Sequence, residues 1–166
     1  MIYSQSLIES DIQRIKKYFP KCKTVIKADI EQDKKGADYI ATLEGGAVIY
    51  IDVKTRVKGA SRYWQYGEPE LALESHSVVE KEKIGWTFSD SAITDYVMFT
   101  FDPSDTELFY IFPFQQLRRA FWQNFKEWKA AYGLKEQVSD NWHSAAVFVP
   151  VPVVIKAMTK LMILKE

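Results

Sequence analysis

The sequence predicts an α/β fold, a three-layer α/β/α arrangement in which helices cover both faces of a central mixed β-sheet. Three observations support this: a helical pattern opens the chain, several strand-like runs follow it, and helical patterns return after them. With 166 residues, of which 47% are hydrophobic and 14% aromatic, the chain can bury one core but is short for two. We therefore expect a single domain over residues 1–166.

The predicted elements follow one another along the chain, with turn signals between them. In order they are a helix over 6–19, strands over 24–30, 38–43, 47–55 and 71–75, a hairpin of strands over 96–101 and 108–112, a long helix from residue 113, a strand over 147–149 and a helix over 153–161. Ile8, Ile12 and Ile15 recur every three or four residues, which predicts the first helix, and Pro20 ends it. The secondary structure of residues 80–86 is ambiguous from the sequence.

The strands are predicted by their composition and by the turns that join them. Residues 24–30 are rich in β-branched side chains, and a Gly45-Gly46 turn joins the next two strands into a hairpin. In the short strand that follows, we expect Leu71 and Leu73 to point inward. Turn-forming residues over 102–105 separate the two aromatic-rich strands of the second hairpin.

The long helix starts at Pro113, because proline favours the first position of a helix. Its apolar residues are spaced to share one face: Phe114, Leu117, Phe121 and Trp128. Its opposite face carries Arg119, Trp122, Lys126 and Lys129. This second face fits either a track for phosphates or, more simply, an ordinary solvated surface.

Composition excludes several classes of protein. The 22 basic and 22 acidic residues cancel, so any attraction to nucleic acid must come from local clustering of charge. One cysteine excludes an internal disulfide, and with only two histidines a structural zinc site is not expected. We expect a cytoplasmic protein, because the first eleven residues do not form a signal peptide and no apolar run is long enough to span a membrane.

Two adjacent strands are expected to bring two carboxylates and a lysine together. Side chains alternate along a strand, so Asp52 and Lys54 share one face with Tyr50, while the apolar residues between them share the other. The compact glycine turn lets Asp38 approach Asp52 from the neighbouring strand. The sequence thus predicts a polar site on one face of a hairpin whose other face is buried.

Two neighbouring carboxylates can bind Mg²⁺ while the ion keeps most of its waters and takes phosphate oxygens. Such an ion would lower the pKa of a bound water and neutralise charge on a phosphate during in-line displacement. Asp38 and Asp52 are the predicted ligands, and the Val53 carbonyl is a candidate third. We expect Lys54, held cationic by the acids, to orient the attacking water and stabilise the developing anion. Alone, an Asp-x-Lys pattern also fits ordinary polar patterning on a strand.

Four features occur together: Asp38 after a glycine at the start of a strand, the compact turn, Asp52 with Lys54, and the preceding amphipathic helix. Together they resemble the PD-(D/E)xK nuclease superfamily, which has the restriction-endonuclease-like fold. The layout is most similar to archaeal Holliday-junction resolvases and related small nucleases. The resemblance covers about the first third of the chain, and Ala37 stands where the family usually has proline. Beyond Lys54 no stretch matches a particular subfamily.

The resemblance implies a metal-dependent endonuclease that hydrolyses DNA, with Asp38, Asp52 and Lys54 as catalytic residues. It also implies Mg²⁺ as the cofactor, with Mn²⁺ able to substitute, and it adds Glu9 on the first helix as a candidate metal ligand. From its place on the short strand over 71–75, Glu74 either points toward the same ion or lies on the surface.

A basic and aromatic segment follows the site directly. It contains Arg56, Lys58, Arg62 and Trp64, with no acidic residue before Glu68. Cations contact phosphates and exposed aromatic rings stack on bases, so we predict that these residues bind nucleic acid and that residues 57–69 form an exposed loop. In the alternative reading, the aromatic side chains of this loop fold back onto the core.

Two further functions stay open. A nuclease scaffold without turnover would bind nucleic acid or a protein partner through the basic loop, and an RNA nuclease would use the same metal chemistry. A homodimer is a further expectation, because cutting two strands often uses two copies of one site.

Overall fold

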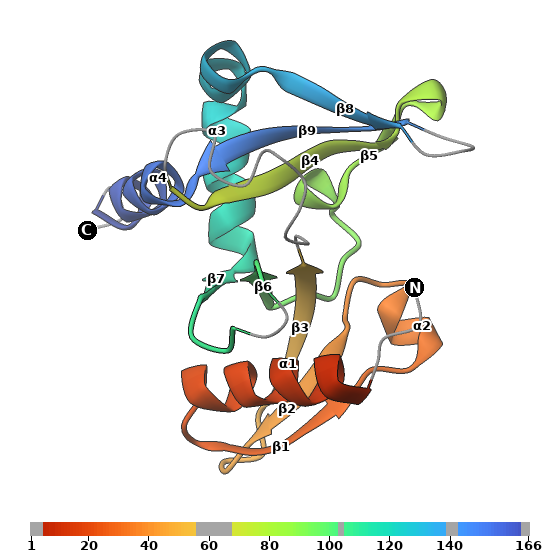
Figure 1. Cartoon of the computed structure of the whole chain (residues 1–166), viewed down its shortest axis with the longest axis vertical. Coiled ribbons are helices and arrows are strands. Elements are labelled where there is room, and N and C mark those ends of the chain that lie inside the picture. Colours follow the sequence, from red (N-terminus) through yellow and green to blue (C-terminus); the bar gives the residue numbers. More distant parts are fainter. Residues whose placement is uncertain (1–4, 56–67, 103–104, 139–142, 164–166) are drawn as a thin grey trace. The chain divides into compact units, whose positions relative to one another are not determined.

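The computed structural model describes residues 5–55, 68–102, 105–138 and 143–163 (Figure 1). Its elements are α1 (Gln5–Tyr18), β1 (Cys22–Lys27), α2 (Ile30–Asp33), β2 (Tyr39–Leu43), β3 (Val48–Thr55), β4 (Glu70–Val78), η1 (Val79–Lys81), β5 (Lys83–Ile84), η2 (Trp86–Phe88), β6 (Tyr96–Thr100), β7 (Phe109–Pro113), α3 (Phe114–Tyr132), β8 (Leu134–Val138), β9 (His143–Pro150) and α4 (Val151–Ile163). The mixed α/β class is as predicted, while the specific three-layer core stays a prediction.

Backbone contacts divide the chain into two compact units. The first consists of Met1–Ala60 and Ser91–Phe114, and the second of Ser61–Asp90 and Gln115–Glu166. The sequence did not predict this division. Two compact units can belong to one domain, so the single domain over residues 1–166 stays a prediction.

The first unit contains a five-stranded mixed sheet in the order β1-β2-β3-β6-β7. β1, β2 and β3 pair antiparallel in succession, β3 pairs parallel with β6, and β6 pairs antiparallel with β7. Both predicted hairpins are therefore confirmed. The parallel pair of β3 and β6 makes the sheet mixed, as the sequence predicted.

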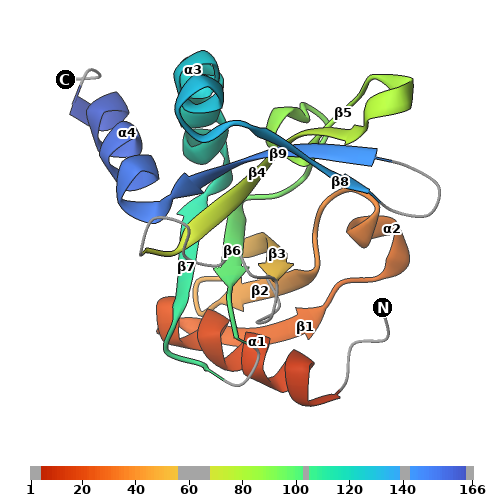
Figure 2. The ribbon, with the colours of Figure 1, turned by 45° about the horizontal axis from the view of Figure 1, so that its top comes forward.

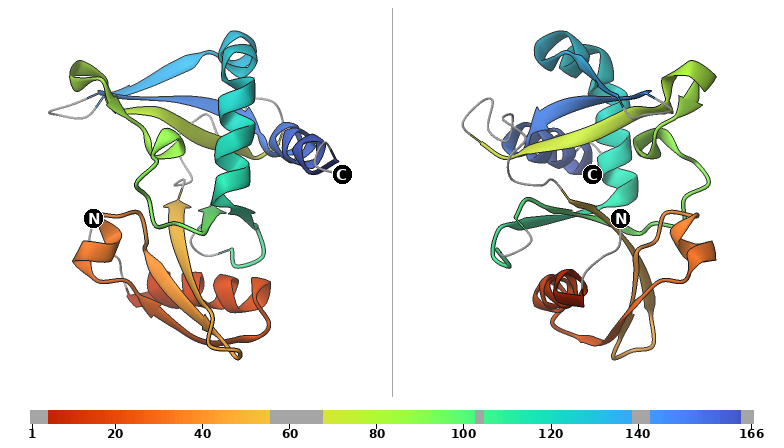
Figure 3. Two further views of the ribbon diagram at one scale, coloured as in Figure 1. Left: turned by 180° about the vertical axis from the view of Figure 1, so that it is seen from behind. Right: turned by 45° about the vertical axis from the view of Figure 1, so that its right-hand side comes forward.

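Helix α1 lies along one face of β1, β2 and β3 (Figures 1 and 3). Ile15 of this helix is fully buried in a cluster with Tyr39 and Ala41 of β2 and with Ile51 and Val53 of β3. The apolar faces predicted for the helix and for the strand are therefore both confirmed, and the structure packs them against each other. Burial of this apolar surface is the main term that stabilises the first unit.

Strand β1 is shorter at its carboxyl end than the predicted strand over 24–30. The reason is Asp29, whose carboxylate accepts hydrogen bonds from the N–H groups of Glu31 and Gln32 at 3.0 and 2.9 Å. The Gln32 side chain accepts from the Asp29 N–H in return, which completes a capping box for the short helix α2. A local cap thus ends the strand and starts a helix that the strand pattern concealed.

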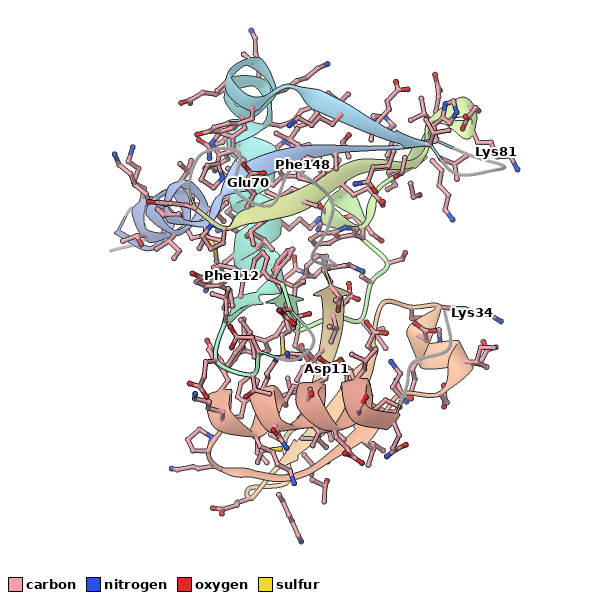
Figure 4. The ribbon with its side chains drawn as sticks, in the orientation of Figure 1. Asp11, Lys34, Glu70, Lys81, Phe112 and Phe148 are labelled. Carbon is pink, nitrogen blue, oxygen red and sulfur yellow. The ribbon has the colours of Figure 1, made fainter. Side chains whose placement is uncertain are left out.

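The second unit contains a four-stranded antiparallel sheet in the order β5-β4-β9-β8, and Figure 2 shows β9 running between β4 and β8. Leu71 and Leu73 are fully buried, as predicted, and β4 is longer than the expected strand over 71–75. Glu70, at the start of β4, is fully buried and is labelled in Figure 4. Strand β8 was not predicted, because its polar residues are largely exposed at the edge of the sheet.

Helix α3 confirms the predicted faces of the long helix. Its four predicted apolar residues, Phe114, Leu117, Phe121 and Trp128, are buried, and Arg119, Trp122, Lys126 and Lys129 are exposed. In the second unit this helix lies across one face of the sheet (Figure 3). The phosphate track on its exposed face stays a prediction. None of the helices in the described ranges is both long and apolar enough to cross a bilayer.

Candidate active site

The structure brings Asp38, Asp52 and Lys54 together in the first unit. Tyr39 pairs with Ile51 across β2 and β3, which places the preceding Asp38 beside Asp52. Lys54 lies two residues further along β3 on the same face. The juxtaposition predicted from the glycine turn and the strand alternation is therefore present.

The contacts within this group are short. Lys54 Nζ lies 2.9 Å from Asp52 Oδ1 and 2.8 Å from Asp52 Oδ2. Asp38 Oδ2 accepts a hydrogen bond from the Val53 N–H at 2.8 Å, and the side chains of Asp38 and Asp52 are hydrogen-bonded to each other. The Lys54 side chain is 33% exposed and that of Asp52 only 9%, so the lysine faces the open side of a buried acid.

The loop before Asp38 is fastened to a second loop of the same unit. Gly36 has a φ of +88°, which favours glycine, and a Cβ built there would lie 2.9 Å from Thr94 Oγ1. The Thr94 hydroxyl donates to the Gly36 carbonyl, and the Ile93 N–H donates to the Lys35 carbonyl at 3.0 Å. These bonds fix the backbone that presents Asp38.

The two carboxylates have unlike acidities. Burial raises the pKa of Asp52 to about 6; Lys54 opposes this rise, and the hydrogen bond with Asp38 adds to it. Burial also acts to raise the pKa of Asp38, but its hydrogen bonds with Asp52 and the Val53 N–H, and the charge of Lys27, outweigh burial and lower it. Such a split is expected when one proton is shared, with Asp52 holding it and donating to Asp38.

Lys27 is a site residue that the sequence did not indicate. Its Nζ lies 3.2 Å from Asp38 Oδ1 and 4.6 Å from the ring centroid of Tyr39. It reaches Asp38 because β1 pairs with β2 in a register that sets Lys27 opposite Tyr39. That register includes an irregularity between Cys22 and Thr24, so strand alternation alone could not have identified this lysine.

A buried polar cluster lies under the same sheet, between α1 and β2. Asp11 (labelled in Figure 4) accepts hydrogen bonds from Arg14 Nη1 at 2.9 Å and from the Tyr39 hydroxyl at 3.0 Å. Arg14 Nη2 also donates to the carbonyls of Asp102 and Asp105, each at 2.9 Å. Burial raises the pKa of Asp11, although Tyr39 and Arg14 oppose the rise. The cluster ties α1 to the sheet and to the loop before β7.

Glu9, the predicted ligand from the first helix, is not brought to the carboxylate pair. It is exposed on α1 and accepts a hydrogen bond from Gln5 Nε2 at 3.3 Å. The acid of this helix that points into the unit is Asp11. Glu9 and Asp11 are two positions apart, which places them on nearly opposite sides of the helix. Glu74 lies in the second unit, where its Oε1 accepts from the Trp86 N–H at 3.4 Å.

The predicted nucleic-acid contacts Arg56, Lys58, Arg62 and Trp64, and most of the loop expected over 57–69, lie outside the described residues. Within the described ranges, no three acid, histidine or cysteine side chains gather closely enough to hold a metal ion. The donor set near Lys54 is therefore the pair Asp38 and Asp52. Two carboxylates fit Mg²⁺, which usually takes one or two from a protein and completes its shell with water and phosphate. The Val53 carbonyl as a further ligand stays a prediction.

No protein-family model, curated protein or solved structure matches this chain. A functional assignment must therefore be argued from the site itself.

Proposed function

We propose that this protein is a Mg²⁺-dependent phosphodiester hydrolase that acts on DNA. The observation that carries the proposal is the buried carboxylate of Asp52, which contacts Lys54 and lies beside the half-buried carboxylate of Asp38 on one face of the β2–β3 hairpin. Perturbed acidity in a paired, buried group that borders solvent is characteristic of functional sites. The nuclease resemblance of the sequence points to the same chemistry.

Asp38 and Asp52 would hold the ion, since together they offer adjacent oxygen ligands on a rigid hairpin. Bound there, Mg²⁺ would supply an activated water and would neutralise charge on the phosphate. Asp52 must lose its proton to act as a ligand, so ion binding should strengthen as the pH rises through about 6. The proposal therefore includes a pH dependence that is set by Asp52.

Lys54 would act as a fixed cation. Its ammonium group contacts both carboxylate oxygens of Asp52, and a third of its side chain is exposed, so it can also face a phosphate oxygen. Stabilisation of charge that develops on the phosphate is worth a factor of about 10²–10³ in rate for one well-placed donor. A lysine beside two carboxylates stays protonated, which suits this role better than that of a general base.

Cleavage of labelled linear DNA, in duplex and single-stranded form, tests the proposal with Mg²⁺, with Mn²⁺ and with excess chelator. Asp38→Asn, Asp52→Asn and Lys54→Ala should each reduce the rate by about a hundredfold or more. The matched controls are Lys17→Ala and Glu107→Gln, which break an exposed lysine–carboxylate pair in the same unit and should cleave as the wild type does. Wild-type cleavage that is unchanged in chelator would contradict the metal role.

One observation favours a second function, that of a scaffold that binds nucleic acid or a protein without turnover. Each carboxylate of the pair already has a lysine neighbour, Asp38 with Lys27 and Asp52 with Lys54, so their four charges cancel without a metal ion. Binding and cleavage measured in parallel separate the two functions, since binding without nicking supports the scaffold. Adding unlabelled RNA as a competitor distinguishes a DNA nuclease from an RNA nuclease.

A further inference from the structure

The sheet of the first unit has a second face, opposite α1. Ile51 and Val53 point into the cluster under α1, so Tyr50, Asp52 and Lys54 point to the other face. The strand register places Ile26 of β1, Ile40 of β2 and Tyr50 of β3 side by side in one row across that face. The row and the carboxylate pair therefore occupy the same surface.

This row is apolar and open to water. Ile26 is 57% exposed, Ile40 and Tyr50 are partly exposed, and Val48, two residues before Tyr50 on the same face, is 49% exposed. Aliphatic side chains that are exposed in adjoining positions, rather than singly, mark surfaces that bind a ligand or partner. The row is thus a candidate surface for flat, apolar groups.

Tyr50 is held firmly in its strand. Its N–H donates to Asp95 Oδ2 at 2.8 Å, and its carbonyl accepts from the Asp95 N–H at 2.9 Å. Asp95 directly precedes β6, the parallel neighbour of β3, so the backbone of this tyrosine is fixed from the β6 side. Its side chain has only two rotatable torsions, so on a fixed backbone it loses little conformational entropy when it stacks on a ligand.

Distance and charge decide what this surface would bind. Two residues of a strand span about 6–7 Å, so the Tyr50 ring starts one such step from Asp52. The two acids and their two lysines sum to zero charge, so with a bound Mg²⁺ and the Asp95 carboxylate beside Tyr50 the local net charge would be +1. A cationic centre that adjoins a flat apolar row is complementary to a nucleotide, with its phosphate at the centre and its base on the row.

We propose that Tyr50 is a specificity-determining residue that stacks on an unpaired base beside the scissile phosphate, with Ile40 and Ile26 extending this platform. The preferred substrate is then single-stranded DNA, because bases inside a duplex are already stacked on both sides and offer no free ring to Tyr50. This inference rests on the proposed function and adds the substrate class to it.

The test measures binding of a fluorescently labelled single-stranded oligodeoxynucleotide by anisotropy with Ca²⁺, and its cleavage with Mg²⁺, beside a duplex of the same sequence. Stacking of one base is worth about 5-fold to 150-fold in affinity, so Tyr50→Ala should weaken single-strand binding by a factor in that range. Tyr50→Phe keeps the ring and should stay within about twofold of the wild type. The matched control Tyr18→Ala removes a tyrosine that is 44% exposed on α1 and should bind normally.

Circular dichroism of each variant establishes that it is folded. Single-strand binding that Tyr50→Ala leaves within about twofold, or a wild-type preference for duplex, overturns the inference even when Mg²⁺-dependent cleavage is present. Conversely, binding that depends on the Tyr50 ring but never leads to cleavage supports the platform and refutes the hydrolase. A wild-type protein that neither binds nor cleaves DNA refutes both.

Discussion

Asp52→Asn should make the metal-free protein more stable at neutral pH while it abolishes cleavage. The substitution removes a charge that the folded chain keeps almost entirely out of water, since the Asp52 side chain is 9% exposed. The asparagine amide has the same shape and can still donate a hydrogen bond to Asp38. Function and stability should therefore change in opposite directions at this one position.

The size of the effect follows from the acidity of Asp52. Its pKa is about 6 in the folded protein against 3.8 for an ordinary aspartate. Folded chains thus hold this proton more tightly than unfolded chains, so the contribution of Asp52 is complete below pH 3.8 and is lost as the pH rises through about 6. The two values differ by about two pH units, each worth about 1.4 kcal/mol, which gives a loss of about 3 kcal/mol.

Urea denaturation followed by circular dichroism measures this difference, in chelator, at a series of pH values from 3.5 to about 8. The free energy of unfolding of Asp52→Asn, relative to wild type, should rise by about 3 kcal/mol between pH 4 and pH 7. The titration of Asp38 does not interfere, because its pKa is lowered and it changes the stability only below pH 3.8. A relative stability that stays flat, or that falls, across this range would refute the reasoning.

Addition of Mg²⁺ at pH 7.5 completes the experiment. An ion at ten times its dissociation constant should stabilise the wild type by about 1.4 kcal/mol and Asp52→Asn by much less. Glu107→Gln, the exposed-carboxylate control, should gain as the wild type does. An equal gain for Asp52→Asn would place the ion elsewhere.

Two further predictions concern residues around the pair. Arg14→Leu should destabilise the protein by about 3–5 kcal/mol, because it leaves the buried Asp11 carboxylate without its ion-pair partner. The control Lys17→Ala, on the exposed side of α1, should cost under about 1 kcal/mol. Urea denaturation measures both. Lys27→Ala should destabilise by about 1 kcal/mol at pH 6 and by progressively less as the pH falls below 3.8, because the lowered pKa of Asp38 contributes stability that is lost as the pH falls through it. Lys27→Arg should retain that stability. A Lys27→Ala effect that does not shrink below pH 3.8 would show that the lysine acts through packing alone.

Much of the site could be predicted because its geometry is local. Asp52 and Lys54 are two residues apart on a strand whose other face is buried, and a buried face fixes which side chains point outward. Asp38 joins them through a turn of a few residues, so the register of the hairpin leaves few alternatives. Local spacing and one short turn were sufficient.

The features that were missed depend on contacts between distant segments or on the phase of a helix. Lys27 reaches Asp38 only through the register of β1, and Asp95 fixes Tyr50 only because β6 pairs with β3. Glu9 and Asp11 are both polar residues of one amphipathic helix, and the sequence alone did not show which of them the fold would bury. The second sheet was missed because β8 is a short, polar edge strand with no alternating apolar pattern.

The parallel neighbours at the centre of the first sheet also bear on the order in which the chain can fold. Tyr50 and the Asp95 that brackets its backbone are 45 residues apart, and the second unit takes up part of the intervening chain. During synthesis, the strand that carries both Asp52 and Lys54 has an open edge until β6 leaves the ribosome, and such edges invite pairing with other chains. No amino-terminal fragment that stops before β6 can present the finished candidate site.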